Sequence, residues 1–167
     1  MKTVSRLALA AIFLLFVAAG GMATAQGMQV AFGSAAEESD LPVEVTAQNL
    51  DVDQNDGTAV FTGDVRVGQG QMRLAAPRVL VVYLADGSGI ARLEATGGVT
   101  LVSGEDAAEA AEADYNVETG MIEMTGDVLL VQGPAALTSD RMIVDTVAGT
   151  ARMTGRVNTV LQSEARQ

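Results

Sequence analysis

Residues 61–65 read Phe-Thr-Gly-Asp-Val, and three near copies of this phrase follow along the chain. The copies are Ala-Thr-Gly-Gly-Val at 95–99, Met-Thr-Gly-Asp-Val at 124–128 and Met-Thr-Gly-Arg-Val at 153–157. Their glycines follow one another at spacings of 34, 29 and 29 residues. A period in that range is typical of stacked supersecondary units that cannot bury their apolar faces alone. The repeat therefore predicts a continuous β surface rather than a pocket with catalytic side chains.

Each phrase is preceded by a turn signal. These signals are Asn55-Asp56-Gly57, Asp86-Gly87-Ser88-Gly89, Glu118-Thr119-Gly120 and Ala148-Gly149. A glycine in each of them can take the positive φ that tight hairpin turns require. The segments before the turns, at 50–52, 78–84, 113–117 and 141–144, are interpreted as second strands. The chain is thus predicted to be a series of antiparallel hairpins, interrupted at 103–112 by an acidic loop with at most one helical turn.

Side chains two positions apart in a strand share a face, so the repeat also predicts an apolar face. That face collects Phe61, Val65, Val67, Leu93, Ala95, Val99, Leu101, Ile122, Met124, Val128, Leu130, Ala151, Met153 and Val157. The repeated glycine lies on the same face, and a glycine inside a strand usually marks a bulge or a bend. Equivalent bends would make the sheet curl over on itself. The pattern favours an ordinary sandwich core, while the Met-rich aliphatic surface also suits a groove for hydrocarbon chains.

The first residues are typical of an export signal. Lys2 and Arg6 precede an apolar run at 7–19, and Ala23-Thr24-Ala25 fits a signal-peptidase site with cleavage between Ala25 and Gln26. The run is shorter than the roughly 20 residues of a membrane-spanning helix. We therefore predict a signal peptide at 1–25, a flexible leader at 26–41, one β domain at 42–162 and a disordered tail at 163–167.

Composition limits the function. Without residues 1–25 the chain has 8 Arg against 21 acidic residues, a balance of −13, so nucleic acid is not expected as a partner. The chain has no Cys and no His, which removes the thiolate nucleophile, the commonest general base and the usual zinc ligands. The acidic stretch at 51–57 departs from a calcium loop, because its sixth residue is Asp56 and its twelfth is Thr62. We name no catalytic residue, cofactor or metal ligand.

The phrase at 61–65, following Asn55-Asp56-Gly57 and preceding Met-Arg-Leu-Ala-Ala-Pro-Arg-Val at 72–79, resembles the repeat of the periplasmic lipopolysaccharide-transport proteins of the LptA/OstA family. The segments at 113–115 and 139–144 are similar to the second element of that repeat, and the resemblance runs from about Val43 to Leu161. Pro77 stands where the family pattern usually has an acidic residue. The resemblance implies an all-β, OstA-like jellyroll of repeated antiparallel hairpins with an open hydrophobic interior.

The resemblance also implies a function, a site and partners. The protein would be a non-enzymatic periplasmic carrier that bridges inner and outer membranes and holds the lipid A acyl chains of lipopolysaccharide in a hydrophobic β-groove. The groove interior would be formed by Phe61, Val65, Val67, Leu93, Val99, Leu101, Ile122, Met124, Val128, Leu130, Met153 and Val157. Its partners would be homologous jellyroll domains of the inner- and outer-membrane transport components, with head-to-tail self-association. Two other hypotheses stay open: a periplasmic β-solenoid scaffold without ligand, and a membrane-anchored inner-membrane component that retains residues 7–19.

Overall fold

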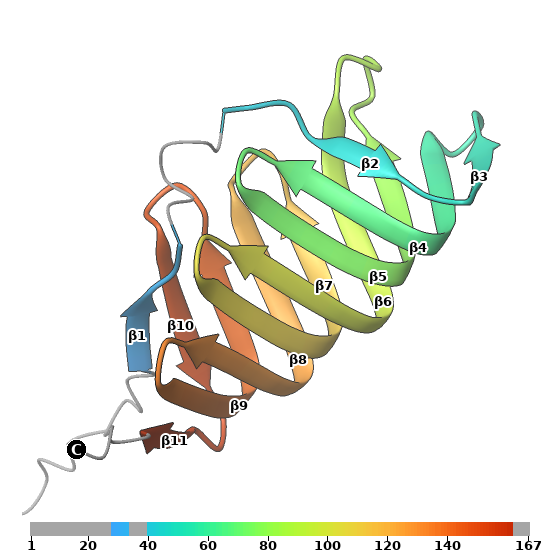
Figure 1. Ribbon diagram of the computed structural model, residues 1–167. Helices are drawn as coiled ribbons and strands as arrows, with labels where there is room; N and C mark the ends of the chain where they lie inside the picture. The colour runs from blue at the N-terminus through green and yellow to red at the C-terminus, as the bar shows by residue number, and fades with distance from the viewer. Residues whose placement is uncertain (1–27, 34–39, 162–167) are drawn as a thin grey trace, which may run out of the picture.

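The computed structural model describes residues 28–33 and 40–161, which form an antiparallel β-sheet with no helix among them (Figure 1). The strands are β1 (Met28–Ala31), β2 (Glu44–Thr46), β3 (Asn49–Asp53), β4 (Thr58–Gln69), β5 (Met72–Tyr83), β6 (Ile90–Ser103), β7 (Asp106–Asn116), β8 (Met121–Gln132), β9 (Ala135–Asp145), β10 (Thr150–Thr154) and β11 (Asn158–Leu161). The predicted turns are confirmed, since they connect β3 to β4, β5 to β6, β7 to β8 and β9 to β10.

The sheet is a stack of hairpins with two open ends. Its order is β1-β10-β9-β8-β7-β6-β5-β4-β2, with β11 added to β9 and β3 added to β4. The long strands β4 to β9 lie side by side as curved ribbons, with β2 and β3 at one end and β1 and β11 at the other (Figure 1). At one end β2 and β3 both pair with β4, and at the other end β10 and β11 both pair with β9 while β1 pairs with β10.

Two sequence predictions need correction. The acidic loop predicted at 103–112 is wrong, because Asp106–Asn116 forms β7, paired to β6 on one side and to β8 on the other. Pairing on both sides outweighs the helix preference of alanine and glutamate. Part of the predicted flexible leader, Met28–Ala31, forms β1 against β10. The predicted signal peptide, the predicted tail and residues 26–27 and 34–39 of the leader lie outside the described residues.

The repeated glycines mark β-bulges, as the sequence predicts. In the β4–β5 pair, Thr62 is opposite Arg78 and Val65 is opposite Ala76. The two residues between them on β4, at 63 and 64, therefore oppose the single residue Pro77. Pro77 lacks a backbone N–H, and a position where the ladder is already interrupted tolerates that loss. The same two-against-one arrangement recurs between β6 and β7 and between β8 and β9.

The bulges explain which residues can follow the glycine. Asp64 and Asp127 have φ values of 45° and 48°, and Gly98 has 97°. Short side chains such as Asp, and glycine above all, tolerate this left-handed region. The second bulge position thus selects Asp or Gly, which is the observed variation in the first three phrases.

The bulges also shift the phase of the neighbouring strands. In β5, Leu74 and Ala76 are buried before the bulge and Val79 and Val81 after it, so the alternation slips by one residue. The bulge removes the glycine itself from the alternation, and Gly126 is exposed. The prediction that these glycines lie on the apolar face is therefore wrong for Gly97 and Gly126, which are both exposed, because a bulge residue belongs to neither face.

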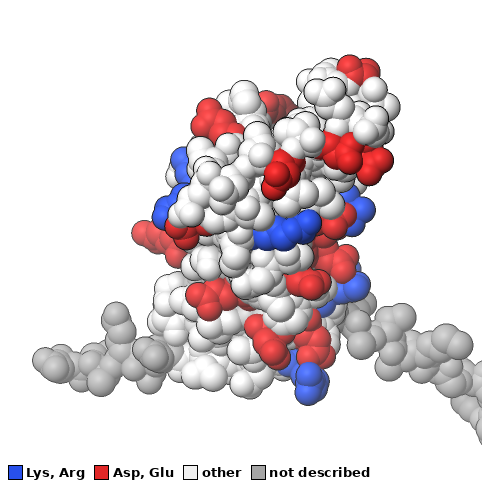
Figure 2. Space-filling view, turned by 90° about the vertical axis from the view of Figure 1, so that its right-hand side faces the viewer, with Lys and Arg blue, Asp and Glu red and all other residues white. Residues whose placement is uncertain are grey.

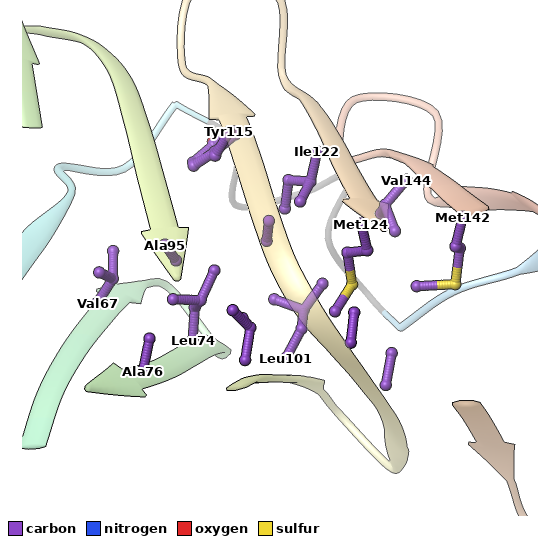
Figure 3. Close-up of a cluster of buried hydrophobic side chains, with 14 of the residues drawn as sticks. Val67, Leu74, Ala76, Ala95, Leu101, Tyr115, Ile122, Met124, Met142 and Val144 are labelled. Carbon is purple, nitrogen blue, oxygen red and sulfur yellow. The ribbon is translucent and has the colours of Figure 1, made fainter. Parts of the chain in front are cut away.

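Bending at the bulges folds the sheet into a jellyroll with two facing halves. Half A is formed by residues 65–76, 99–110 and 128–139, which contain the β4–β5, β6–β7 and β8–β9 turns. Half B is formed by residues 58–62, 78–96, 112–125 and 141–154, on the other side of the bulges. Their apolar side chains belong to one buried cluster. Figure 3 shows Leu74 and Leu101 of half A gathered with Ile122 and Met124 of half B in the interior.

Candidate functional site

The structure places most of the predicted groove residues in this interior. Ten of them are at most 3% exposed: Val65, Val67, Leu93, Val99, Leu101, Ile122, Met124, Val128, Leu130 and Met153. Phe61 is partly buried and packs against the same cluster. Val157 is misplaced by the prediction, because it follows the end of β10 and is 36% exposed.

Sequence reasoning missed the interior residues of β5, β7 and β9, the strands that pair with the phrase-bearing strands. These strands contribute Met72, Leu74, Ala76, Val79, Val81, Ala108, Ala110, Ala113, Tyr115, Leu137, Met142 and Val144. The signal in the sequence is a period-2 alternation that changes phase once per strand. The buried positions of these strands become predictable when each strand is divided into two parts, before and after the residue opposite the bulge.

The interior side chains bury one another closely. Val65, Leu101, Met124 and Val144 are all 0% exposed. A hollow of about 480 Å³ lies at the bulges, where its lining includes Gly63, Pro77 and Gly98. A hydrocarbon guest in the interior must therefore separate side chains that now pack together.

A short polar chain links the two halves on the side away from the bulges. The Tyr115 hydroxyl, in half B, donates to Gln69 Oε1, in half A, at 2.6 Å. The Gln69 side-chain amide donates in turn to the carbonyl of Leu41 at 2.9 Å. Burial raises the pKa of the Tyr115 phenol, which extends to higher pH the range in which the phenol is neutral and able to donate. One hydrogen bond thus joins the two halves on the open side of the jellyroll, and a second ties Gln69 to the chain before β2.

The outer surface of the jellyroll is charged. Arg92 pairs with Asp114, and Arg141 pairs with Glu123 at 2.8 Å. Figure 2 shows acidic and basic side chains interspersed on one side of the molecule. Within the described residues no group of three or more acidic side chains could hold a metal ion. The interior is therefore the candidate site, and it has the chemistry of a hydrocarbon-binding surface.

The two ends of the sheet expose apolar side chains on short strands. In β3, Leu50 is 53% and Val52 is 59% exposed. In β11, at the opposite end, Val160 is 54% and Leu161 is 72% exposed. Sheet edges carry backbone groups that can pair with a further strand. Both ends are therefore candidate contact surfaces for another β domain.

No helix within residues 28–33 and 40–161 has the length and apolarity needed to cross a membrane.

Comparison with known proteins identifies the family. A family model described as LptA/(LptD N-terminal domain) LPS transport protein matches residues 44–150, from the start of β2 to the start of β10. The chain belongs to this family. The LPS-transport family resemblance predicted from the phrase at 61–65 is therefore confirmed, and the match includes all three bulges that interrupt β4, β6 and β8.

A solved structure has the same fold. It is LptH from Pseudomonas aeruginosa, described as the LptA homologous periplasmic component of the conserved lipopolysaccharide transport device. The TM-score is 0.66 at 19% sequence identity, over 78% of this chain and 99% of that chain. No curated protein matches the chain. The predicted all-β jellyroll is confirmed.

Proposed function

We propose that this protein is a periplasmic carrier of lipopolysaccharide that holds the lipid's acyl chains between the two halves of its jellyroll. The observation that carries the proposal is the interior itself: a continuous aliphatic surface across β4 to β9, in a member of a lipopolysaccharide-transport family. The side chains proposed to contact the acyl chains include Val65, Leu101, Met124 and Val128. No step of this role requires a catalytic residue.

The physical chemistry of the lipid supports this use of the fold. Each methylene removed from water stabilises a complex by about 0.8 kcal/mol. A lipid with several acyl chains therefore cannot cross an aqueous compartment uncovered. An interior of Val, Leu, Ile, Met and Ala shields those chains, while sugars remain in water beside the charged outer surface. Met124, Met142 and Met153 add flexible, polarizable side chains that adapt to a mobile guest.

The open ends support a bridging role. Homologous jellyroll domains of membrane components, or a second copy of this chain, would extend the sheet by pairing with β2 and β3 at one end or with β1 and β11 at the other. Leu50 and Val52 would be covered in the first contact, and Val160 and Leu161 in the second. The predicted signal peptide, cleaved between Ala25 and Gln26, would deliver the protein to the periplasm.

Photo-crosslinking tests the acyl-chain site. A benzophenone amino acid replaces Phe61, an aromatic side chain that lines the interior and is only partly buried, so the substitution is expected to be tolerated. The matched control carries the same group at Val131, which is 40% exposed on the outer side of β8. With lipopolysaccharide present, irradiation should add the lipid mass at position 61 and not at 131. Equal capture at both positions would refute the interior site.

The close burial of the interior also fits a scaffold without ligand, and mass spectrometry separates the two functions. The protein is purified from the periplasm without detergent and measured intact under native conditions. Bound lipopolysaccharide supports the carrier. Protein that stays free of lipid, even after incubation with excess lipopolysaccharide, would instead support the scaffold.

A further inference from the structure

The described residues at the N-terminus form a strap across the open side of the jellyroll. We define the N-terminal strap as Met28–Gly33. Its first part, β1, pairs antiparallel with β10, from Met28 opposite Met153 to Ala31 opposite Thr150. The chain then turns inward, and Phe32 is 0% exposed within the same apolar cluster that lines the interior.

The strap is hydrogen-bonded to both halves. The Phe32 amide donates to the carbonyl of Gly149, in the β9–β10 turn of half B, at 3.0 Å. The Gln132 side-chain amide of half A donates to the carbonyl of Ala31 at 2.7 Å. The Gly33 amide donates to Asp106 Oδ2, also in half A, at 2.8 Å. These bonds add to the Tyr115–Gln69 hydrogen bond in joining the halves on the side away from the bulges.

One contact of the strap is unfavourable. Gly33 has φ of +58°, and a Cβ at its position would lie 2.0 Å from Ser103 Oγ. Ser103 is 1% exposed, and its hydroxyl has no hydrogen-bond partner in the described part of the chain. Burying the Ser103 hydroxyl without a hydrogen bond destabilises the bound position of the strap, because water would bond to that hydroxyl if the strap dissociated. Such a contact is expected of a segment that must leave.

We propose that the N-terminal strap is a displaceable cover of the interior, and that Phe32 occupies the place taken by part of one acyl chain when lipid binds. The inference rests on the proposed carrier function and adds its regulation. Among the buried hydrophobic residues of the described chain, Phe32 is the one that lies outside β4 to β10, directly after the short edge strand β1. Withdrawing it vacates the volume of an aromatic ring and breaks the strap's links between the halves. Lipid binding and strap release are therefore coupled.

An engineered disulfide holds the strap in place. The chain has no Cys, so cysteines at Gln29 and Arg152, exposed register partners in β1 and β10, form a unique pair. A control pair at Leu129 and Thr138 cross-links β8 to β9 and leaves the strap untouched. Binding of fluorescent lipopolysaccharide is followed by anisotropy. The oxidised strap pair should bind at least tenfold more weakly than its reduced form, and the control pair should bind equally in both states.

A second pair of variants frees the strap instead. Gly33→Ala cannot seat against Ser103, and should accelerate lipid association at least threefold. Gly57→Ala is the matched control, since Gly57 has φ of +63° with nothing within 4 Å of its Cβ position. Equal affinity of the oxidised and reduced strap pair, with unchanged association in Gly33→Ala, would overturn the strap proposal while leaving the carrier intact. Absence of lipid binding in every form, wild type included, would overturn the carrier function itself.

Discussion

Replacing Gly126 by alanine tests whether the bulges fix the jellyroll. Gly126 has φ of +85°, a conformation that costs an L-residue about 1–2 kcal/mol. A Cβ there would also lie 2.7 Å from the Cβ of Ala111 on β7. That methyl group is fixed to the backbone and cannot rotate away, and overpacking of this kind costs about 1–3 kcal/mol. We therefore expect Gly126→Ala to lower the free energy of unfolding by about 2–5 kcal/mol.

Urea unfolding measures this loss, and Gly57→Ala isolates the contribution of backbone strain. Gly57 has φ of +63° and open space around its Cβ position, so its replacement should cost only about 1–2 kcal/mol. The denaturation midpoint should shift in both variants while the slope m stays constant.

A double-mutant cycle isolates the contribution of the steric clash. Ala111→Gly removes the methyl group that the new Cβ would meet, and should recover about 1–3 kcal/mol in the Gly126→Ala background. Backbone strain at Gly126 remains in the double variant, so recovery should be partial. A Gly126→Ala cost no larger than that of Gly57→Ala, or an absence of coupling to Ala111, would refute the packing account of the bulge.

Three further perturbations test the interior link, the bulge and the open ends. Tyr115→Phe removes the hydroxyl that bonds Gln69, so unfolding free energy at neutral pH should fall by about 1–2 kcal/mol in urea. Burial raises the folded-state pKa of Tyr115, so the unfolded chain loses the phenol proton at a lower pH than the folded chain. The contribution of Tyr115 to the unfolding free energy should therefore be complete below about pH 10 and decline above it. An equal alkaline loss of stability in Tyr115→Phe would contradict this. Asp127 has φ of 48°, so Asp127→Gly should stay within about 0.5 kcal/mol of the parent while Asp127→Val loses more than about 1 kcal/mol, and similar losses would contradict the left-handed requirement. Lysine at Val52 or Val160 should weaken self-association in sedimentation velocity without lowering Tm, whereas unchanged association would exclude these ends as contacts.

The sequence was sufficient to predict the hairpin stack and the interior residues of the phrase-bearing strands. The phrase-bearing strands kept their alternation because each bulge adds a residue, so that Met124 and Val128, four positions apart, point the same way. The partner strands have no inserted residue, and there Ala76 and Val79, three positions apart, both face the interior. A uniform period of two therefore succeeds in one set of strands and fails in the other.

Tertiary contacts decided the elements that sequence reasoning misassigned. In β7, alanines and glutamates have strong helix preference, yet pairing with both β6 and β8 places Ala108 and Ala110 inside and Glu109 outside. The strand β1 has only four residues, and its partner β10 lies more than 110 residues further along the chain. No local pattern marks so short a strand, because its stability comes from a distant edge and from the burial of Phe32.

A jellyroll made by bending one sheet necessarily has a seam where the two halves meet. The bulges hold the halves together at one side through continuous backbone. At the seam, the halves are linked within the described residues by the Tyr115–Gln69 hydrogen bond and by the N-terminal strap. A guest hydrocarbon that enters through the seam replaces apolar protein contacts by apolar lipid contacts, so its main cost is the breaking of those links. Variation at the seam should therefore change lipid binding more than conservative exchanges such as Leu101→Met or Met124→Leu inside it, which preserve both volume and apolarity.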